Sequence, residues 1–164
     1  MKYILLCVIL LLSCDKGSKD ASRRNNPSAV IEIGQADKEI ERIAENARRS
    51  LPIFLRNLAR PGPGAGNFCV KYPLTSYDGR TEHIWLGGIR IKDGVCYGSV
   101  VNSTRFNDSI KKGDTIIFEM DSITDWMYVQ DGKIVGGSSI KYLLEKTPEA
   151  QRSEEQRKIL GMFD

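Results

Sequence analysis

The residues of this chain best suited to chemistry lie around its single histidine, His83. Glu82 precedes it and Trp85 follows two residues later. A histidine with a carboxylate acts in catalysis only if a nucleophile or an activated water lies within hydrogen-bonding reach. Glu82 and His83 are neighbours on a predicted strand, so their side chains should diverge. Asp125 would orient His83 only if a bulge interrupted its strand.

Other catalytic and metal-binding motifs do not occur in the sequence. Serines at 99, 103, 138 and 139 lack the G-x-S-x-G context of a nucleophile elbow. Zinc sites usually need three or four ligands, whereas one histidine and two dispersed cysteines are present. We therefore expect no metal and no cofactor. The simpler interpretation gives His83 and Asp125 structural hydrogen bonds, with Asp125 accepting from backbone amides at a bend.

Alternation along two strands suggests a binding surface. In "EHIWL", Ile84 and Leu86 look like core residues, so their neighbours point to the opposite face. In "SITDWMYV", the aromatic residues point away from Asp125. If both strands share a sheet, His83, Trp85, Trp126 and Tyr128 would share one surface, and such aromatics favour binding. Alternatively, a helix covers this face. The candidate binding residues are Glu82, His83, Trp85, Asn102, Asp125, Trp126 and Tyr128.

These residues must be positioned by a helix and a sheet. Apolar residues from Ile40 to Leu58 recur at helical spacing after a possible N-cap, Asp37, and the pattern continues across Pro52. This predicts an amphipathic helix over 37–59, kinked near Pro52. After residue 66 the pattern alternates as in strands, and three Asp-Gly pairs favour tight hairpins.

The predicted fold is α+β, with the kinked helix packed on a curved antiparallel sheet of about five to six strands. A short helix should begin at Thr147 and end near Gly161. Its apolar stripe is thin, which predicts loose docking or exposure to solvent.

The N-terminus has the features of an export signal. Lys2 precedes ten apolar residues, fewer than the roughly 20 that a membrane-spanning helix needs. Leu11-Leu12-Ser13-Cys14 resembles the lipobox of bacterial lipoproteins. The resemblance implies cleavage before Cys14 and its acylation (palmitate), which would anchor the chain in a membrane. Asp15 resembles the signal that retains lipoproteins in the inner membrane.

The expected organisation is a signal peptide at 1–13, a polar lipidated tether at 14–35, a single domain at 36–146 and a C-terminal helix or tail at 147–164. The predicted location is the cell envelope, facing the periplasm or the exterior. Removing Lys2 with the signal changes the net charge from 24 − 21 = +3 to 23 − 21 = +2. No basic stripe with interleaved aromatics occurs, so we expect no nucleic-acid partner.

The cysteines follow from this location. Cys7 lies in the signal and Cys14 is the predicted lipid site, which leaves Cys69 and Cys96. An oxidising compartment permits a disulfide between the last two. The alternative is two separately buried thiols.

Several stretches together carry a resemblance to a known family. They are "ARRSLPIFL", "FCVKYPL", "EHIWLGGI", "GSVVNS", "KKGDTIIF" and "DWMYVQDGKIVGG". The chain resembles the YegJ-like family of bacterial proteins (domain of unknown function 2314) over roughly residues 37–145. It departs from the family pattern at Ser138-Ser139 and at Ser103-Thr104. The resemblance implies an α+β domain with a sheet and carries no established activity.

Three functional hypotheses follow. The one we favour is a lipid-anchored envelope protein that acts as a binding or interaction module, for example in immunity-type recognition of a protein partner. The second is a small-ligand enzyme or hydrolase that uses His83 with Glu82 or Asp125. The third is a structural component of the envelope.

Overall fold

The first described element is a long helix. The computed structural model describes residues 27–163, with side chains from residue 38 onward. Helix α1 (Pro27–Ala59) is one helix that contains Pro52. It therefore begins well before the predicted N-cap, Asp37, and takes in residues 27–35 of the expected tether. The predicted signal peptide, Cys14 and Asp15 lie outside the described residues. No helix within 27–163 is long and apolar enough to cross a membrane.

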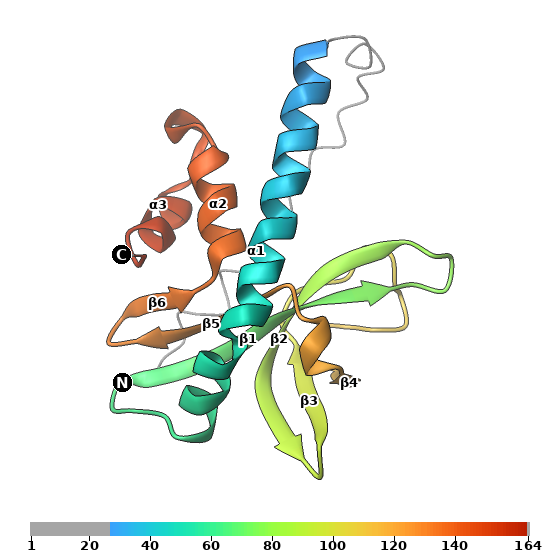
Figure 1. The fold of residues 1–164 in the computed structure, drawn as a ribbon, viewed down its shortest axis with the longest axis vertical. Helices are drawn as coiled ribbons and strands as arrows, with labels where there is room; N and C mark the ends of the chain where they lie inside the picture. The colour runs from blue at the N-terminus through green and yellow to red at the C-terminus, as the bar shows by residue number, and fades with distance from the viewer. Residues whose placement is uncertain (1–26, 164) are drawn as a thin grey trace.

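Six antiparallel strands form one sheet in the order β4-β3-β2-β1-β5-β6. A 3₁₀ turn, η3 (Met120–Ser122), lies between β4 and β5. Figure 1 shows α1 running across this sheet, with its N-terminal half extending beyond it. The predicted α+β class, with a helix on an antiparallel sheet, is confirmed. The strands are β1 (Ala65–Thr75), β2 (Thr81–Lys92), β3 (Val95–Val100), β4 (Thr115–Phe118), β5 (Asp125–Gln130) and β6 (Lys133–Gly136).

The hairpin turns follow from the Asp-Gly pairs. Asp93 and Gly94 have φ values of 50° and 78° between β2 and β3, and Asp131 and Gly132 have values of 49° and 81° between β5 and β6. Two successive positive φ values are typical of type I′ turns, which match the twist of the flanking strands. The third pair, which includes Gly79, lies in the turn between β1 and β2. The hairpins predicted from this dipeptide are therefore confirmed.

One face of the sheet packs against α1. The apolar stripe of the helix contributes Ala47, Leu51 and Phe54 to this cluster, and Phe54 is fully buried. Residues of every strand supply the sheet side, with β6 contributing only the partly buried Val135. The sheet residues are Val70, Ile84, Leu86, Ile89, Cys96, Val100, Phe118, Trp126 and Tyr128, and Ile123 joins them from the segment before β5.

The opposite face is covered by the C-terminal segment. Helix α2 (Ser138–Lys146), the 3₁₀ turn η4 (Glu149–Gln151) and helix α3 (Glu154–Leu160) follow β6. They form a second cluster with the sheet, made of Cys69, Trp85, Met127, Ile134, Ile140, Leu144 and Ile159. Helices therefore cover one face of the sheet and, on the other face, the part formed by β1, β2, β5 and β6.

The expected short C-terminal helix is present as α3 and ends at Gly161 as predicted, but its start was misplaced and one of its residues is buried. The Thr147 hydroxyl donates to the carbonyl of Leu143 at 2.9 Å, so Thr147 ends α2 and does not begin a helix. α3 begins after Ser153, whose side chain forms a capping box with Gln156. Ile159 is buried in the second cluster. Residues 147–163 thus pack with the rest of the domain and are not a loose tail.

Candidate functional site

The two tryptophans lie on opposite faces of the sheet. Lys71 on β1 pairs with Trp85 on β2 and with Asp125 on β5. Val70, its neighbour, pairs with Trp126. Because successive residues of a strand point to opposite faces, Trp85 shares a face with Asp125 and Trp126 lies on the other face.

The predicted common surface of His83, Trp85, Trp126 and Tyr128 is therefore wrong. The alternation within each strand was assigned correctly. The error lies in the register between the strands, which decides which face of one strand continues which face of the other. Each tryptophan is only 6% exposed.

Trp126 packs against α1 and forms hydrogen bonds with it. Its indole Nε1 donates to the Ala47 carbonyl and to the Ser50 hydroxyl, each at 3.1 Å. Its ring lies 5.6 Å from that of Phe54 and 6.2 Å from that of Tyr128. A buried tryptophan whose N–H is satisfied in this way supports packing, and so does Tyr128 beside it.

Trp85 is held from its backbone side by Asn102. The amide of Trp85 donates to Asn102 Oδ1 at 2.7 Å, so this side chain continues the pairing beyond the end of β3. Glu82 has a similar role, because its carboxylate accepts from the amides of Arg105 at 2.8 Å and Phe106 at 3.1 Å. Both predicted site residues thus shape the loop that joins β3 to β4.

Asp125 is the centre of a buried polar cluster. It is 2% exposed, and its two oxygens accept from the amides of Trp126 at 2.8 Å and Ser139 at 2.7 Å. Ser139 lies in the first turn of α2, where a carboxylate also favours the helix dipole. The prediction that Asp125 accepts from backbone amides is confirmed. Lys71 Nζ completes the cluster by donating to Ser139 Oγ at 3.2 Å.

Burial shifts both charged groups of this cluster toward their neutral forms. Burial raises the pKa of the Asp125 carboxyl, against the hydrogen bonds from Ser139 and Trp126 and the charge of Lys71. Burial also lowers the pKa of the Lys71 ammonium, and the charge of Asp125 opposes that shift. A lysine beside a serine hydroxyl is a known nucleophile arrangement. Ser139, however, is 2% exposed, so the arrangement holds α2 in place and leaves no access for a substrate.

Sequence reasoning missed Lys71 and Ser139 as members of this cluster. A signal was available for the first of them. Lys71 interrupts the otherwise apolar run "FCVKYPL", and a lysine on a buried strand usually requires a partner. Ser139 stood out only as a departure from the family pattern, which does not indicate a partner on a distant strand.

His83 stands apart from both carboxylates. Its side chain makes no hydrogen bond to any residue within the described part of the chain. The predicted divergence from Glu82 is confirmed, because the Glu82 carboxylate is bonded to loop amides. His83 is an exposed residue, yet desolvation by partial burial and then the charge of Lys71 lower its pKa. Neither Glu82 nor Asp125 orients this ring for acid–base chemistry.

The two cysteines of the domain are not joined. Cys69 and Cys96 are both buried thiols. They belong to the two different clusters, on opposite faces of the sheet. The disulfide that an oxidising compartment would permit is therefore not formed, and the alternative of two separately buried thiols is correct. Within residues 27–163, no group of three or more His, Cys, Asp or Glu side chains could hold a metal ion.

The turn between β1 and β2 is held by hydrogen bonds among its own residues and carries an exposed tyrosine. The Ser76 hydroxyl donates to the Arg80 carbonyl at 2.9 Å and also bonds the Asp78 carboxylate. Asp78 Oδ2 accepts from Arg80 Nε at 2.7 Å. Hydrogen bonds from Arg80 and Ser76 hold the pKa of Asp78 well below its usual range. Tyr77, within this network, is fully exposed.

A second loop extends this surface. The Arg80 guanidinium lies 4.4 Å from the ring centroid of Phe106, which is 38% exposed. The Glu82 carboxylate accepts a hydrogen bond from the backbone amide of Phe106 and so holds this loop residue in place. Figure 1 shows the β1–β2 turn projecting away from the helices. We call Tyr77, Arg80 and Phe106 the Tyr77 surface.

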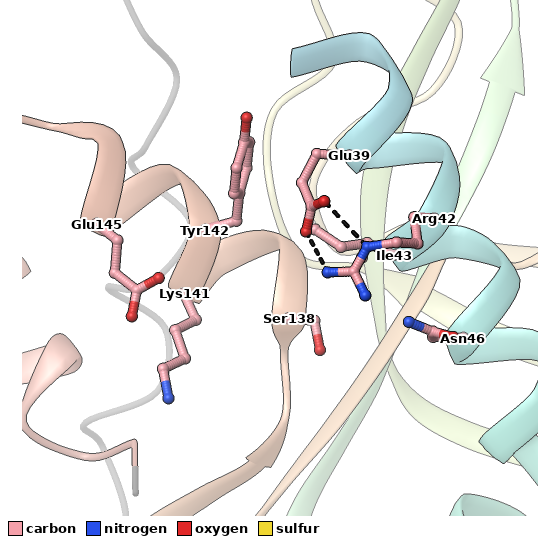
Figure 2. A pocket seen from close by; sticks show the side chains of 8 residues that line it. All are labelled: Glu39, Arg42, Ile43, Asn46, Ser138, Lys141, Tyr142 and Glu145. Carbon is pink, nitrogen blue, oxygen red and sulfur yellow. Dashed lines mark hydrogen bonds and ion pairs between the residues drawn. The ribbon is translucent and has the colours of Figure 1, made fainter. Parts of the chain in front are cut away.

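A small groove lies between α1 and α2 (Figure 2). Its volume is about 170 Å³, below the roughly 300–1,000 Å³ of typical ligand pockets. Charges of both signs line it, and Arg42 is bonded to Glu39 at 3.0 Å. None of the residues predicted from the sequence lines this groove. Its walls are Glu39, Arg42, Ile43 and Asn46 from α1 and Ser138, Lys141, Tyr142 and Glu145 from α2.

Comparison with protein families gives one match over most of the chain. The model of DUF2314, described as an uncharacterized protein conserved in bacteria, matches residues 37–163. The chain belongs to this family. The DUF2314 match runs past α2 to the residues that close the second cluster, in agreement with the packing of α3.

Two relatives of the chain belong to named bacteria. The "Uncharacterized protein YegJ" of Escherichia coli strain K12 is 28% identical over 160 residues, which cover 98% of this chain and 99% of that protein. A putative ankyrin repeat protein of Neisseria meningitidis serogroup B is 30% identical over 134 residues, 77% of this chain and 53% of that protein. No solved structure matches the chain.

Proposed function

We propose that this DUF2314 protein is a lipid-anchored module of the bacterial envelope that binds another protein through the Tyr77 surface. The observation that carries the proposal is a fully exposed tyrosine on a turn whose other side chains are bonded to one another. Binding to such a turn costs little ordering entropy, because its conformation is already fixed.

The composition of the surface supports recognition of protein. Tyrosine and arginine are enriched among the residues that dominate interface energies. The Arg80 guanidinium lies over the Phe106 ring and Asp78 bonds its Nε, so these two side chains form one patch, and the exposed Tyr77 lies on the same turn as Arg80. A patch of this kind packs against a partner's side chains and backbone, and no pocket is needed.

The family context agrees with an interaction role. The Neisseria relative is named as an ankyrin repeat protein, and this chain matches about half of its length. Repeat architectures form extended binding surfaces. A DUF2314 domain joined to such repeats is consistent with a module that takes part in protein assemblies.

The membrane anchor rests on Leu11–Cys14, which resembles a lipobox. Acyl chains on Cys14 would hold the module at a bilayer surface, and Asp15 favours the inner membrane. Cys14→Ala should move the protein from the membrane fraction to the soluble fraction and remove the acyl mass from the N-terminal peptide. Retention of the variant in membranes without acylation would contradict the anchor.

Recognition is tested by photo-cross-linking in the cells that make the protein. A photoreactive residue at position 77 should give one discrete cross-linked protein, and Arg80→Ala together with Phe106→Ala should reduce its yield. Position 143 is the matched control, because Leu143 is also exposed, at 45%, but lies on α2. Identical products from both positions, or none from position 77, would contradict the proposal.

A further inference from the structure

The two edge strands of the sheet differ in whether another segment of the chain covers them. At the β6 edge, the amide of Ile134 donates to the carbonyl of Met162 at 2.9 Å, so the C-terminal segment covers that strand. At the other edge, β4 pairs only with β3 within residues 27–163. An uncovered edge strand presents unpaired backbone groups that can bind another strand.

The direction of these groups follows from the pairing. Val100 donates to the Asp114 carbonyl at 2.8 Å, and Gly98 is in register with Ile116. Hydrogen-bonded positions alternate in an antiparallel pair, so Ile116 bonds to β3 while Thr115 and Ile117 direct their N–H and C=O groups outward. No described segment accepts or donates to these outward groups.

The side chains of β4 do not block pairing of this edge with another strand. Natural edges are commonly blocked by charges, proline or a bulge, and "TIIF" has none of these. Ile117 is 66% exposed. It lies opposite the half-buried Tyr97 on the face of the sheet away from α1, so the two side chains form a small apolar spot at the edge.

Charge is arranged so that the edge complements itself. Lys111 and Lys112 precede β4, and Glu119 and Asp121 follow it, all with exposed side chains. In an antiparallel pair of two identical edges, the basic end of each copy meets the acidic end of the other. The additional carboxylate at the basic end, Asp114, accepts from the amide of Lys111 at 2.8 Å.

We propose that two copies of this chain pair β4 with β4, antiparallel, and join their two six-stranded sheets into one continuous sheet. The register that best matches the charges places Thr115 opposite Ile117 of the second copy. Lys111 then lies near Asp121 of that copy. This interface is separate from the Tyr77 surface and does not depend on it.

The test is the oligomeric state of the full acylated chain in detergent, measured by sedimentation. The wild type should be a dimer. Ile117→Lys, which adds a charge to the edge, should weaken dimerisation by about tenfold or more. Ile91→Lys is the matched control, because Ile91 is 51% exposed and lies on β2 away from the edge. It should leave the dimer intact.

A charge swap separates pairing from any effect on folding. Lys111→Glu with Lys112→Glu should give monomers, because both ends of the edge become acidic. Adding Glu119→Lys and Asp121→Lys should restore the dimer. A wild type that is monomeric, including one whose edge binds an extended peptide of another protein instead, would overturn the proposal. So would a swap that restores nothing while all variants melt like the wild type.

Discussion

Asp125 connects three elements through one carboxylate. It accepts from amides of β5 and α2 and faces Lys71 of β1. A buried carboxylate is stable only when its oxygens are bonded and its charge is offset. Its role is therefore to fix the start of α2 on the sheet, which the spacing of acidic residues in the sequence does not reveal.

Removing this carboxylate should be costly. Asp125→Ala leaves two amides and the Lys71 ammonium without their partner, which we expect to lower the free energy of unfolding by about 3 kcal/mol or more. Asp125→Asn should cost less, because one oxygen still accepts. Urea denaturation measures both. Asp108→Ala, at an exposed loop position, should change stability by less than about 0.5 kcal/mol. Equal effects at 125 and 108 would contradict this role.

His83 should titrate at a lower pH than an ordinary histidine. Desolvation and then the charge of Lys71 lower its pKa below the ordinary value of 6.5. The neutral ring is thus favoured in the folded state. Its contribution to stability is complete above pH 6.5 and is lost as the pH falls through the folded pKa. As the only histidine, it gives a single imidazole signal for NMR titration.

Replacement of Lys71 tests the cause of this shift. Lys71→Met should move the His83 pKa part of the way back toward its ordinary value, whereas Lys111→Met should leave it unchanged. A His83 pKa above 6.5 in the wild type would show that the ring has a carboxylate partner after all.

The junction between β6 and α2 depends on a glycine. Gly136 has a φ of 78°, and a Cβ there would lie 2.3 Å from the carbonyl oxygen of Trp126. Gly132, in the β5–β6 turn, has a φ of 81° and open space around it. An alanine at 136 would therefore suffer both backbone strain and a clash with backbone, whereas an alanine at 132 would suffer only the strain.

A pair of alanine variants should separate these two effects. Gly132→Ala should cost about 1–2 kcal/mol, from the left-handed conformation alone. Gly136→Ala should cost at least about 1–3 kcal/mol more, because α2 or Trp126 must shift. Thermal unfolding of both variants measures the difference. Equal losses would mean that the Gly136 backbone relaxes without disturbing α2.

Elements with local signals could be predicted from the sequence, and those set by distant contacts could not. The Asp-Gly pairs place the hairpins, since turn residues and strands act on one another within a few positions. The register that brings Trp126 to the face opposite Trp85 depends on β1, which lies between β2 and β5 in the sheet. Thr147-Pro148 looked like a helix start, although the capping box at Ser153 and Gln156 was also present in the sequence.

The candidate site shows the same division. Glu82, Asn102 and Asp125 proved to be polar residues with important contacts, but each bonds backbone groups. The sequence pattern identified them without their partners, because those partners belong to segments remote along the chain. Tyr77 carried no sequence signal, since exposure on a rigid turn follows from bonds among its neighbours.

On the scale of the whole molecule, a separate buried cluster lies on each face of the sheet, and each tryptophan belongs to one of them. Trp126 faces α1, and Trp85 faces α2 and α3. The second cluster is closed by Ile159 and the residues after it. Loss of this segment should therefore affect one face first.

A chain that ends at Arg152 should expose Trp85. In a Trp126→Phe background, its fluorescence should shift to the red relative to the same background with an intact C-terminus. Ile159→Ala should lower stability by about 2–5 kcal/mol, whereas Lys158→Ala, on the exposed side of α3, should have little effect. Unchanged fluorescence on truncation would mean that α2 alone covers Trp85.

The strand order also has a consequence for how the chain folds. Strands β1 to β4 pair in sequence, as do β5 and β6, so both units can form from local hairpins. Only the β1–β5 pairing joins them, and the Lys71–Asp125 contact spans 125 − 71 = 54 residues. Closing so long a loop is entropically expensive before contacts are gained. We therefore expect this joining step to limit the folding rate, so that Val70 and Trp126 variants slow folding, and so do changes at the β2–β3 turn, which forms before the joining step.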